Sequence, residues 1–224
     1  SVLNKKNIDD FVDSLLTRPP KGYFKHTRTA SRTKVTMRFA LVPDHVKRRM
    51  RPYIPIVEKY CKRYELLVSR VLATIHTESC FNPMARSNRN AIGLMQLVPY
   101  SGGKDAYGAV HGSNLIPTEA YLFDPEKNIE LGCAYIHLLK NRYFGEVKNN
   151  NSRLYCTIAA YNTGPGNVAY AFTGARAMRA ATRVINTMDN SDRVYNHMIG
   201  FLPFGETKRY LTVVLERMGM YGNW

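Results

Sequence analysis

Hydrophobic residues recur every three or four positions over most of this chain, the spacing that gathers them on one face of an α-helix. The pattern begins at Pro43 and continues almost to the C-terminus. A representative stretch has apolar side chains at Tyr53, Ile56, Val57, Tyr60 and Cys61. We therefore predict a mainly α-helical fold, with one compact helical domain over residues 43–224.

The first part of the chain follows a different pattern. Residues 1–34 are polar and basic, and the prolines of RPPKG interrupt any regular element there. In KVTMRFALV the apolar residues alternate with polar ones, which is the period of a strand with one buried face. We expect residues 1–42 to be a linker or the remnant of an upstream domain, with a strand at 35–42.

Several helix ends can be read from the sequence. Asp124 can cap a helix that has Pro125 at its first position, and Gly145 can end that helix. The polar stretch 145–152 indicates a mobile loop, after which Ser152 can cap the next helix. Two more helices are predicted over residues 191–200 and 206–221.

Composition narrows the class of protein. With 224 residues, of which 45% are hydrophobic, the chain can bury a sizeable core. Its net charge of +15 favours a polyanionic partner: nucleic acid, anionic lipid or an acidic cell-wall polymer. The basic residues are scattered, with no zinc-ligand pairs and no platform for stacking bases, so we expect no nucleic-acid binding.

Export and redox state are less clearly encoded. The start, SVLNKKNIDD, has no signal-peptide pattern, and no apolar run reaches the roughly 20 residues that cross a bilayer. We expect the numbering to begin inside a longer precursor. Cys61, Cys80, Cys133 and Cys156 form no CxxC pair, and the sequence leaves open whether they are thiols or disulfides.

One carboxylate lies in an unusual place. If residues 66–79 form a helix, Leu67, Val68, Val71, Leu72 and Ile75 fill one arc of it, and Glu78 falls inside that arc. Burial and the negative end of the helix dipole would both raise the pKa of Glu78, the condition for donating a proton near neutral pH. The alternative is that the helix frays at residue 77 and Glu78 points into solvent.

Two further segments bear on that choice. NAIGLMQLVP, residues 90–99, has a glycine beside an apolar run with one amide, and IAAYNTGPGNV, residues 158–168, leads a helix into a Gly-Pro-Gly turn. With Glu78-Ser79 and Asn82-Pro83, these ordered blocks resemble the E-S-x-x-N-P, G-L-M-Q and A-Y-N-x-G blocks of the family 1 lytic transglycosylases, relatives of goose-type lysozyme. The resemblance extends from about Val42 to Tyr221 and implies a lysozyme-like helical domain.

The resemblance also implies a reaction. Glycosidases commonly use two carboxylates, yet Asp105 lies in an expected loop and Asp124 serves better as a helix cap. The family works with one glutamate, here Glu78, as general acid and then base. It would cleave the MurNAc-β-1,4-GlcNAc bond of peptidoglycan without water and form 1,6-anhydroMurNAc. Neither a metal nor a cofactor is expected.

Supporting residues follow from the same resemblance. Ser87 and Tyr161 match the family's groups near the acid and the N-acetyl group, and Gln96 and Asn162 are expected to shape or line the same cleft. Glu206 resembles a glutamate that faces the groove, although it can equally be an ordinary acid in a helix's first turn. Gly93 is expected to permit a close backbone approach, while Leu94 and Met95 are either core or ligand contacts.

Partners and location follow from the substrate. The resemblance implies binding to peptidoglycan glycan strands, recruitment by an envelope assembly, and a periplasmic protein. In full-length form it would be an outer-membrane lipoprotein whose only membrane contact is an N-terminal lipid anchor missing from these residues. Two other functions stay open: a goose-type lysozyme-like hydrolase and a non-catalytic peptidoglycan-binding scaffold. The sequence does not show whether glycan strands are cleaved at their ends or at internal bonds.

Overall fold

The computed structural model describes residues 24–28, 33–37, 45–188 and 190–222. The chain divides into two compact units, Ser1–His45 and Val46–Trp224. In the first unit, strands β1 (Phe24–Arg28) and β2 (Thr33–Met37) pair antiparallel, with Phe24 opposite Met37. The predicted strand therefore exists over 35–37, and residues 38–42 lie outside the described residues. The sequence FKHTR has no apolar alternation, which is why β1 was not predicted.

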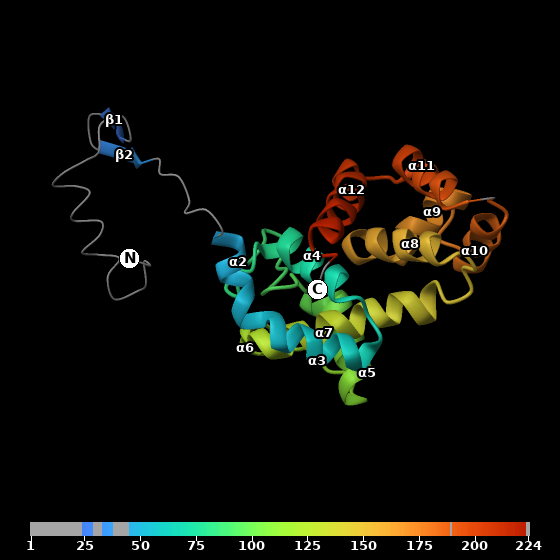
Figure 1. Ribbon diagram of the computed structural model, residues 1–224, viewed down its shortest axis with the longest axis horizontal. Coiled ribbons are helices and arrows are strands. Elements are labelled where there is room, and N and C mark those ends of the chain that lie inside the picture. The colour runs from blue at the N-terminus through green and yellow to red at the C-terminus, as the bar shows by residue number, and fades with distance from the viewer. Residues whose placement is uncertain (1–23, 29–32, 38–44, 189, 223–224) are drawn as a thin grey trace. The chain divides into compact units, whose positions relative to one another are not determined.

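The second unit is mainly helical, as predicted (Figure 1), with a non-helical segment over residues 80–98 that contains two isolated β-bridges. Its α-helices are α2 (His45–Met50), α3 (Ile54–Tyr64), α4 (Val68–Ser79), α5 (Lys104–His111), α6 (Glu119–Phe123), α7 (Pro125–Leu138), α8 (Asn150–Thr163), α9 (Pro165–Thr173), α10 (Met178–Asn186), α11 (Ser191–Phe201) and α12 (Gly205–Met220). Three short turns of 3₁₀ or π geometry, η1 (Arg51–Tyr53), η2 (Pro99–Gly103) and η3 (Leu139–Tyr143), join some of them. Among the described residues, no helix is long and apolar enough to cross a membrane.

Helix α4 is at the centre of the packing. It contacts α3 on one side and α12, more than a hundred residues later in the sequence, on another. Helix α8 packs against α9, α11 and α12, while α7 packs against α3 and α5. The side chains of Leu72 and Ile75 on α4 are completely buried in the resulting core. Burial of this kind removes apolar surface from water and holds α4 in place.

The helix caps show where local sequence rules succeed. The side chain of Asp124 accepts a 3.0 Å hydrogen bond from the N–H of Lys127 and caps α7, with Pro125 at the first position as predicted. The predicted cap of α8 is wrong. Asn149 caps that helix by accepting a 3.0 Å bond from the N–H of Ser152, which is itself buried in the first turn.

The stretch predicted as a mobile loop is instead tied to the fold. The side chain of Asn186 accepts a 2.9 Å hydrogen bond from the N–H of Lys148 and donates one of 2.9 Å to the carbonyl oxygen of Glu146. Val147 between them is completely buried. The prediction of a mobile loop was wrong, because polar composition does not reveal the hydrogen bonds to Asn186 on α10 that hold this segment.

Candidate active site

Glu78 lies in the last turn of α4, where the chain changes direction sharply. Cys80 ends the helix in the left-handed conformation, with a φ of 49°, and Phe81 follows with a φ of 60°. Such angles are unfavourable for residues with side chains and persist where the surrounding structure enforces them. Phe81 is only 1% exposed, so its burial holds the turn that follows Glu78.

The arc predicted for this helix is largely present. Val71, Leu72 and Ile75 are completely buried, and Glu78 is partly buried near them. Leu67 is an exception: it precedes the helix and is 62% exposed, because the helix begins at Val68 rather than at residue 66. The alternative in which the helix frays at residue 77 is wrong, since α4 continues through Ser79.

Glu78 opens into a cleft with a volume of about 610 Å³. All five side chains proposed from sequence to support it line the same cleft: Ser87, Gln96, Tyr161, Asn162 and Glu206. They come from the segment after α4, from α8 and from the first turn of α12. The fold thus gathers residues that are up to 128 positions apart in sequence around one carboxyl group.

The environment of Glu78 changes its acidity. Burial is the main cause that raises the pKa of the carboxyl, to about 7. The buried Tyr210 hydroxyl lowers this pKa, although it makes no hydrogen bond within ordinary geometric limits. The negative charge of Glu206 raises the pKa further, and the positive charge of Arg70 lowers it. A glutamic acid with such a pKa can hold a proton near neutral pH and release it there.

The hydroxyl of Ser87 faces two backbone donors. Its Oγ accepts hydrogen bonds from the N–H of Arg89, at 3.2 Å, and from the N–H of Ala91, at 3.1 Å. Both bonds use lone pairs of the oxygen, so they leave its O–H proton for another acceptor. Ser87 is therefore a fixed hydroxyl at the edge of the cleft that can donate to a bound molecule.

The G-L-M-Q segment is held by buried polar contacts. Asn128 on α7 accepts a 2.8 Å hydrogen bond from the N–H of Met95 and donates to the carbonyl oxygens of Ile92 and Leu122. Gly93 has a φ of +79°, and a Cβ there would lie 2.5 Å from the carbonyl oxygen of Leu122. Only glycine fits this position, which is the close backbone approach predicted from sequence.

Neighbouring residues of this segment have structural roles. Leu94 and Met95 are completely buried, so they belong to the core. Gln96 has a φ of 47° and donates from Nε2 to the carbonyl oxygens of Ala85, at 3.0 Å, and Gly93, at 2.9 Å. Gln96 therefore lines the cleft, and the two hydrogen bonds of its side-chain amide nitrogen hold the backbone of the cleft wall in place.

The three sequence blocks are linked by direct hydrogen bonds. Ser79 donates to the carbonyl oxygen of Leu94 at 2.8 Å, which joins the first block to the second. The Tyr161 hydroxyl donates to the carbonyl oxygen of Met95 at 2.8 Å, which joins the second to the third. Three blocks that are far apart in the sequence therefore meet at one cleft.

The third block is also fixed to α12. The Oδ1 of Asn162 accepts a 2.7 Å hydrogen bond from the hydroxyl of Thr207, and this leaves the amide N–H groups of Asn162 as donors toward the cleft. Glu206, one residue earlier, is 66% exposed and lies 3.7 Å from the guanidinium of Arg89, which is 85% exposed. This ion pair is at the rim, where water weakens it.

Some cleft residues were not identified from sequence. Tyr135 on α7 lines the cleft, and so does Asp105, which lies in the first turn of α5 and not in the expected loop. Asp105 is not among the charges that shift the pKa of Glu78. Buried Tyr210 and Arg70, which do shift it, were also missed. Their positions depend on α12 and on the side of α4 that faces the core, which no short motif specifies.

The cysteines are all free thiols in the structure. Cys61, Cys133 and Cys156 are buried on their helices, and Cys80 is exposed at the end of α4. Burial raises the pKa of the Cys156 thiol to about 12, so it remains protonated at neutral pH. No disulfide joins these four cysteines in the described part of the chain.

Comparison with known proteins agrees with this architecture. The family model described as Transglycosylase SLT domain matches residues 55–184. Membrane-bound lytic murein transglycosylase C from Yersinia pestis (strain Pestoides F) is 42% identical over 174 residues, which are 78% of this chain and 48% of that protein. The same protein from Yersinia pseudotuberculosis serotype O:1b (strain IP 31758) matches equally. The chain spans about half the length of these curated relatives.

Solved structures share the fold. An inactive mutant of the lytic transglycosylase Slt from Pseudomonas aeruginosa matches with a TM-score of 0.55 and 29% identity, over 75% of this chain and 24% of that one. The 70-kDa soluble lytic transglycosylase from Escherichia coli matches with a TM-score of 0.56 and 26% identity, over 80% and 25%. The lysozyme-like helical fold expected from the sequence is therefore confirmed, and the chain belongs to the Transglycosylase SLT domain family.

Proposed function

We propose that this chain cleaves peptidoglycan as a lytic transglycosylase, with Glu78 as its one catalytic acid and base. One observation carries the proposal: the carboxyl group of Glu78 lies in the cleft, and burial raises its pKa to about 7. The family assignment and the 42% identity to lytic murein transglycosylase C support the same reaction class. A single group with a pKa near 7 can serve in both directions of proton transfer.

The chemistry runs in two steps. Protonated Glu78 gives its proton to the oxygen of the MurNAc-β-1,4-GlcNAc bond, and that bond breaks. The substrate's own 2-acetamido carbonyl stabilises the cation that develops at C1. Ionised Glu78 then takes the proton of the C6 hydroxyl as that oxygen closes on C1, which gives 1,6-anhydroMurNAc. Glu78 ends protonated, so no water, metal or cofactor is consumed.

The other cleft residues have proposed roles that fit their contacts. The unused O–H of Ser87 and the amide N–H groups of Asn162 can donate to sugar or acetamido oxygens. Tyr161 presents its ring to the cleft while its hydroxyl is bound to Met95. Gln96 shapes the wall, and Glu206 lies at the rim of the cleft.

Location and partners follow from the proposed substrate. Peptidoglycan lies outside the cytoplasmic membrane, and the relatives carry the name membrane-bound. We place the full-length protein in the periplasm as an outer-membrane lipoprotein, recruited by an envelope assembly. The net charge of +15 favours this substrate, because peptide stems carry carboxylates.

Product analysis tests the reaction directly. Purified sacculi digested with the protein are expected to release anhydro muropeptides, which mass spectrometry finds one water lighter than hydrolysed ones. Release should stop with Glu78→Gln and persist with the matched control Glu58→Gln, an exposed acid on α3. Hydrated products would instead indicate lysozyme-like hydrolysis. Equal release by wild type and Glu78→Gln would show that Glu78 is not the catalytic acid, and no release by either protein would favour the non-catalytic scaffold.

A further inference from the structure

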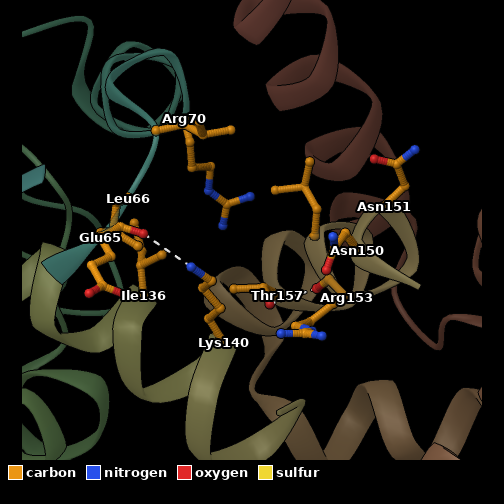
Figure 2. A pocket seen from close by; sticks show the side chains of 11 residues that line it. Glu65, Leu66, Arg70, Ile136, Lys140, Asn150, Asn151, Arg153 and Thr157 are labelled. Atoms are coloured by element: carbon orange, nitrogen blue, oxygen red, sulfur yellow. Dashed lines mark hydrogen bonds between the residues drawn. The ribbon is translucent and has the colours of Figure 1, made fainter. Parts of the chain in front are cut away.

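A second pocket lies away from the cleft and contains an unusual buried cation. The pocket has a volume of about 380 Å³ and shares no lining residue with the cleft. It lies between the start of α4, the end of α7 and the start of α8 (Figure 2). Arg70 and Glu78 are eight residues apart on α4, so their backbone positions are about 12 Å apart along that helix.

Arg70 is 2% exposed, yet none of its three guanidinium nitrogens has a hydrogen-bond partner. Figure 2 shows its side chain directed away from α4, toward the middle of the residues that line the pocket. A buried guanidinium without partners is costly, because it has lost water and gained nothing in return. Groups of this kind in folded proteins usually have an anion or ordered water as their partner.

Two more cations line the same pocket. Lys140 is held by a 3.0 Å hydrogen bond to the carbonyl oxygen of Glu65, and Arg153 donates from Nε to the carbonyl oxygen of Val147 at 3.0 Å. The second bond leaves both terminal nitrogens of Arg153 as donors. The carboxylate of Glu65 is the one acidic group of the lining, and it points away from Arg70 in Figure 2.

The helix that borders the pocket adds to this positive field. Asn150 and Asn151, in the first turn of α8, line the pocket, so the positive end of the helix dipole lies there. The first N–H groups of a helix have no partner within it, and they readily bind anions. The buried guanidinium of Arg70 gives this helix end a second, independent anion-binding group.

The remaining wall is apolar and restricts the kind of anion. Leu66, Ile136 and Leu154 line the pocket beside the cations. A bare inorganic anion would leave these side chains without contacts, whereas a carboxylate on a short aliphatic body would use both surfaces. The end of a peptide chain with small apolar residues has this chemistry.

We propose that this pocket binds the C-terminal carboxylate of a short aliphatic peptide, with Arg70, Lys140 and Arg153 as its cationic ligands. The carboxylate would lie among the three cations, and the peptide side chains would pack against the leucines and Ile136. Such an end could come from an ordinary protein or from a cell-wall peptide. The two sources differ in the chirality of the last residue, which is L in an ordinary protein and D in a cell-wall peptide.

Isothermal titration calorimetry with acetylated dipeptides tests this site. Acetyl-L-alanyl-L-alanine and acetyl-D-alanyl-D-alanine supply the two chiralities, and the C-terminal amides of both serve as uncharged controls. We expect at least one free acid to bind and its amide to bind at least about tenfold more weakly, as loss of a buried charge pair requires. The preferred chirality identifies the source.

Variants assign that binding to the pocket. Arg70→Met keeps an unbranched side chain and removes the charge, so it is expected to fold and to lose at least about tenfold in affinity. Lys62→Met, which removes an exposed cation of α3, is the control for net charge. Glu78 lies outside the lining of this pocket, so Glu78→Gln is expected to keep the preference for the free acid over the amide, which separates this site from the proposed reaction.

Several outcomes overturn the proposal. Equal binding of acid and amide would show that no carboxylate is recognised, and equal binding by wild type and Arg70→Met would exclude the buried cation. Inorganic phosphate that binds more tightly than either dipeptide would refute the aliphatic body. Absence of binding by both free acids would remove the site altogether.

Discussion

The hydroxyl of Tyr161 on α8 donates a 2.8 Å hydrogen bond to the backbone carbonyl of Met95, a buried residue 66 positions earlier. This bond ties together two walls of the cleft that are far apart in the sequence. The bond is buried, so no water can replace it easily. The tyrosine is therefore required first as a positioning residue, whatever its ring contributes to sugar binding.

Tyr161→Phe removes that hydroxyl and leaves the carbonyl of Met95 without its partner. We expect the free energy of unfolding to fall by about 1–3 kcal/mol, the usual cost of an unsatisfied buried group. Urea denaturation measures the loss. The control is Tyr170→Phe, at a tyrosine that is 48% exposed, where little change is expected. Equal stability of the two variants would show that the bond to Met95 does not hold the cleft walls together.

Glycine at position 93 is required for two separable reasons. Its φ of +79° is unfavourable for any other residue, and a Cβ would collide with Leu122 and Asn128. At Gly112 the φ is +63°, but a Cβ would meet nothing within 4 Å. We expect Gly112→Ala to cost about 1–2 kcal/mol from backbone strain alone, and Gly93→Ala to cost clearly more. The difference between the urea midpoints of the two variants measures the cost of the steric collision at Gly93. Equal midpoints would show that this collision costs nothing.

The helical domain was predicted from the periodicity of apolar residues, whereas the residues that line the cleft were expected from the resemblance of short sequence blocks to a known family. Helical periodicity reflects burial along an entire element, and each short block near Glu78 contains the groups that its own backbone needs, such as Ser79 and Gly93. Arg70 and Tyr210 were missed because their importance depends on the packing of α12 against α4, a long-range contact. The cap of α8 was misplaced for a smaller reason, since Asn149 and Ser152 are both good caps.

Protonation of Glu78 should couple to stability. Its folded pKa of about 7 exceeds the ordinary value of 4.5, so folding favours the protonated form. The neutral carboxyl carries no penalty below about pH 4.5, and stability falls as pH rises from there to about 7. Glu78→Gln should therefore be more stable than wild type at pH 8, by up to about 3 kcal/mol. Urea denaturation of both proteins at about pH 4.5 and at pH 8 checks this. A stability difference between them that does not change with pH would contradict the raised pKa.

Arg70 and Glu206 act on Glu78 with opposite signs. The positive charge of Arg70 lowers the pKa of the carboxyl, so Arg70→Met should raise it above its value of about 7. Carbon NMR of the Glu78 carboxyl across a pH titration measures the shift. The variant also loses an unpaired buried charge, so it should be no less stable than wild type. An unchanged or lower pKa in this variant would contradict the action of the guanidinium on Glu78.

Glu206→Gln tests the opposite sign from the rim of the cleft. The negative charge of Glu206 raises the pKa of Glu78, so its removal should lower that pKa, and the high-pH limb of activity should move to lower pH with it. Glu206 is 66% exposed, and salt screens exposed charges, so the shift should shrink as ionic strength rises. The shift from Arg70→Met should persist in salt, because that charge is buried. If both shifts disappear in salt, Arg70 is not shielded from water in solution, and the buried cation of the second pocket must be rejected with it.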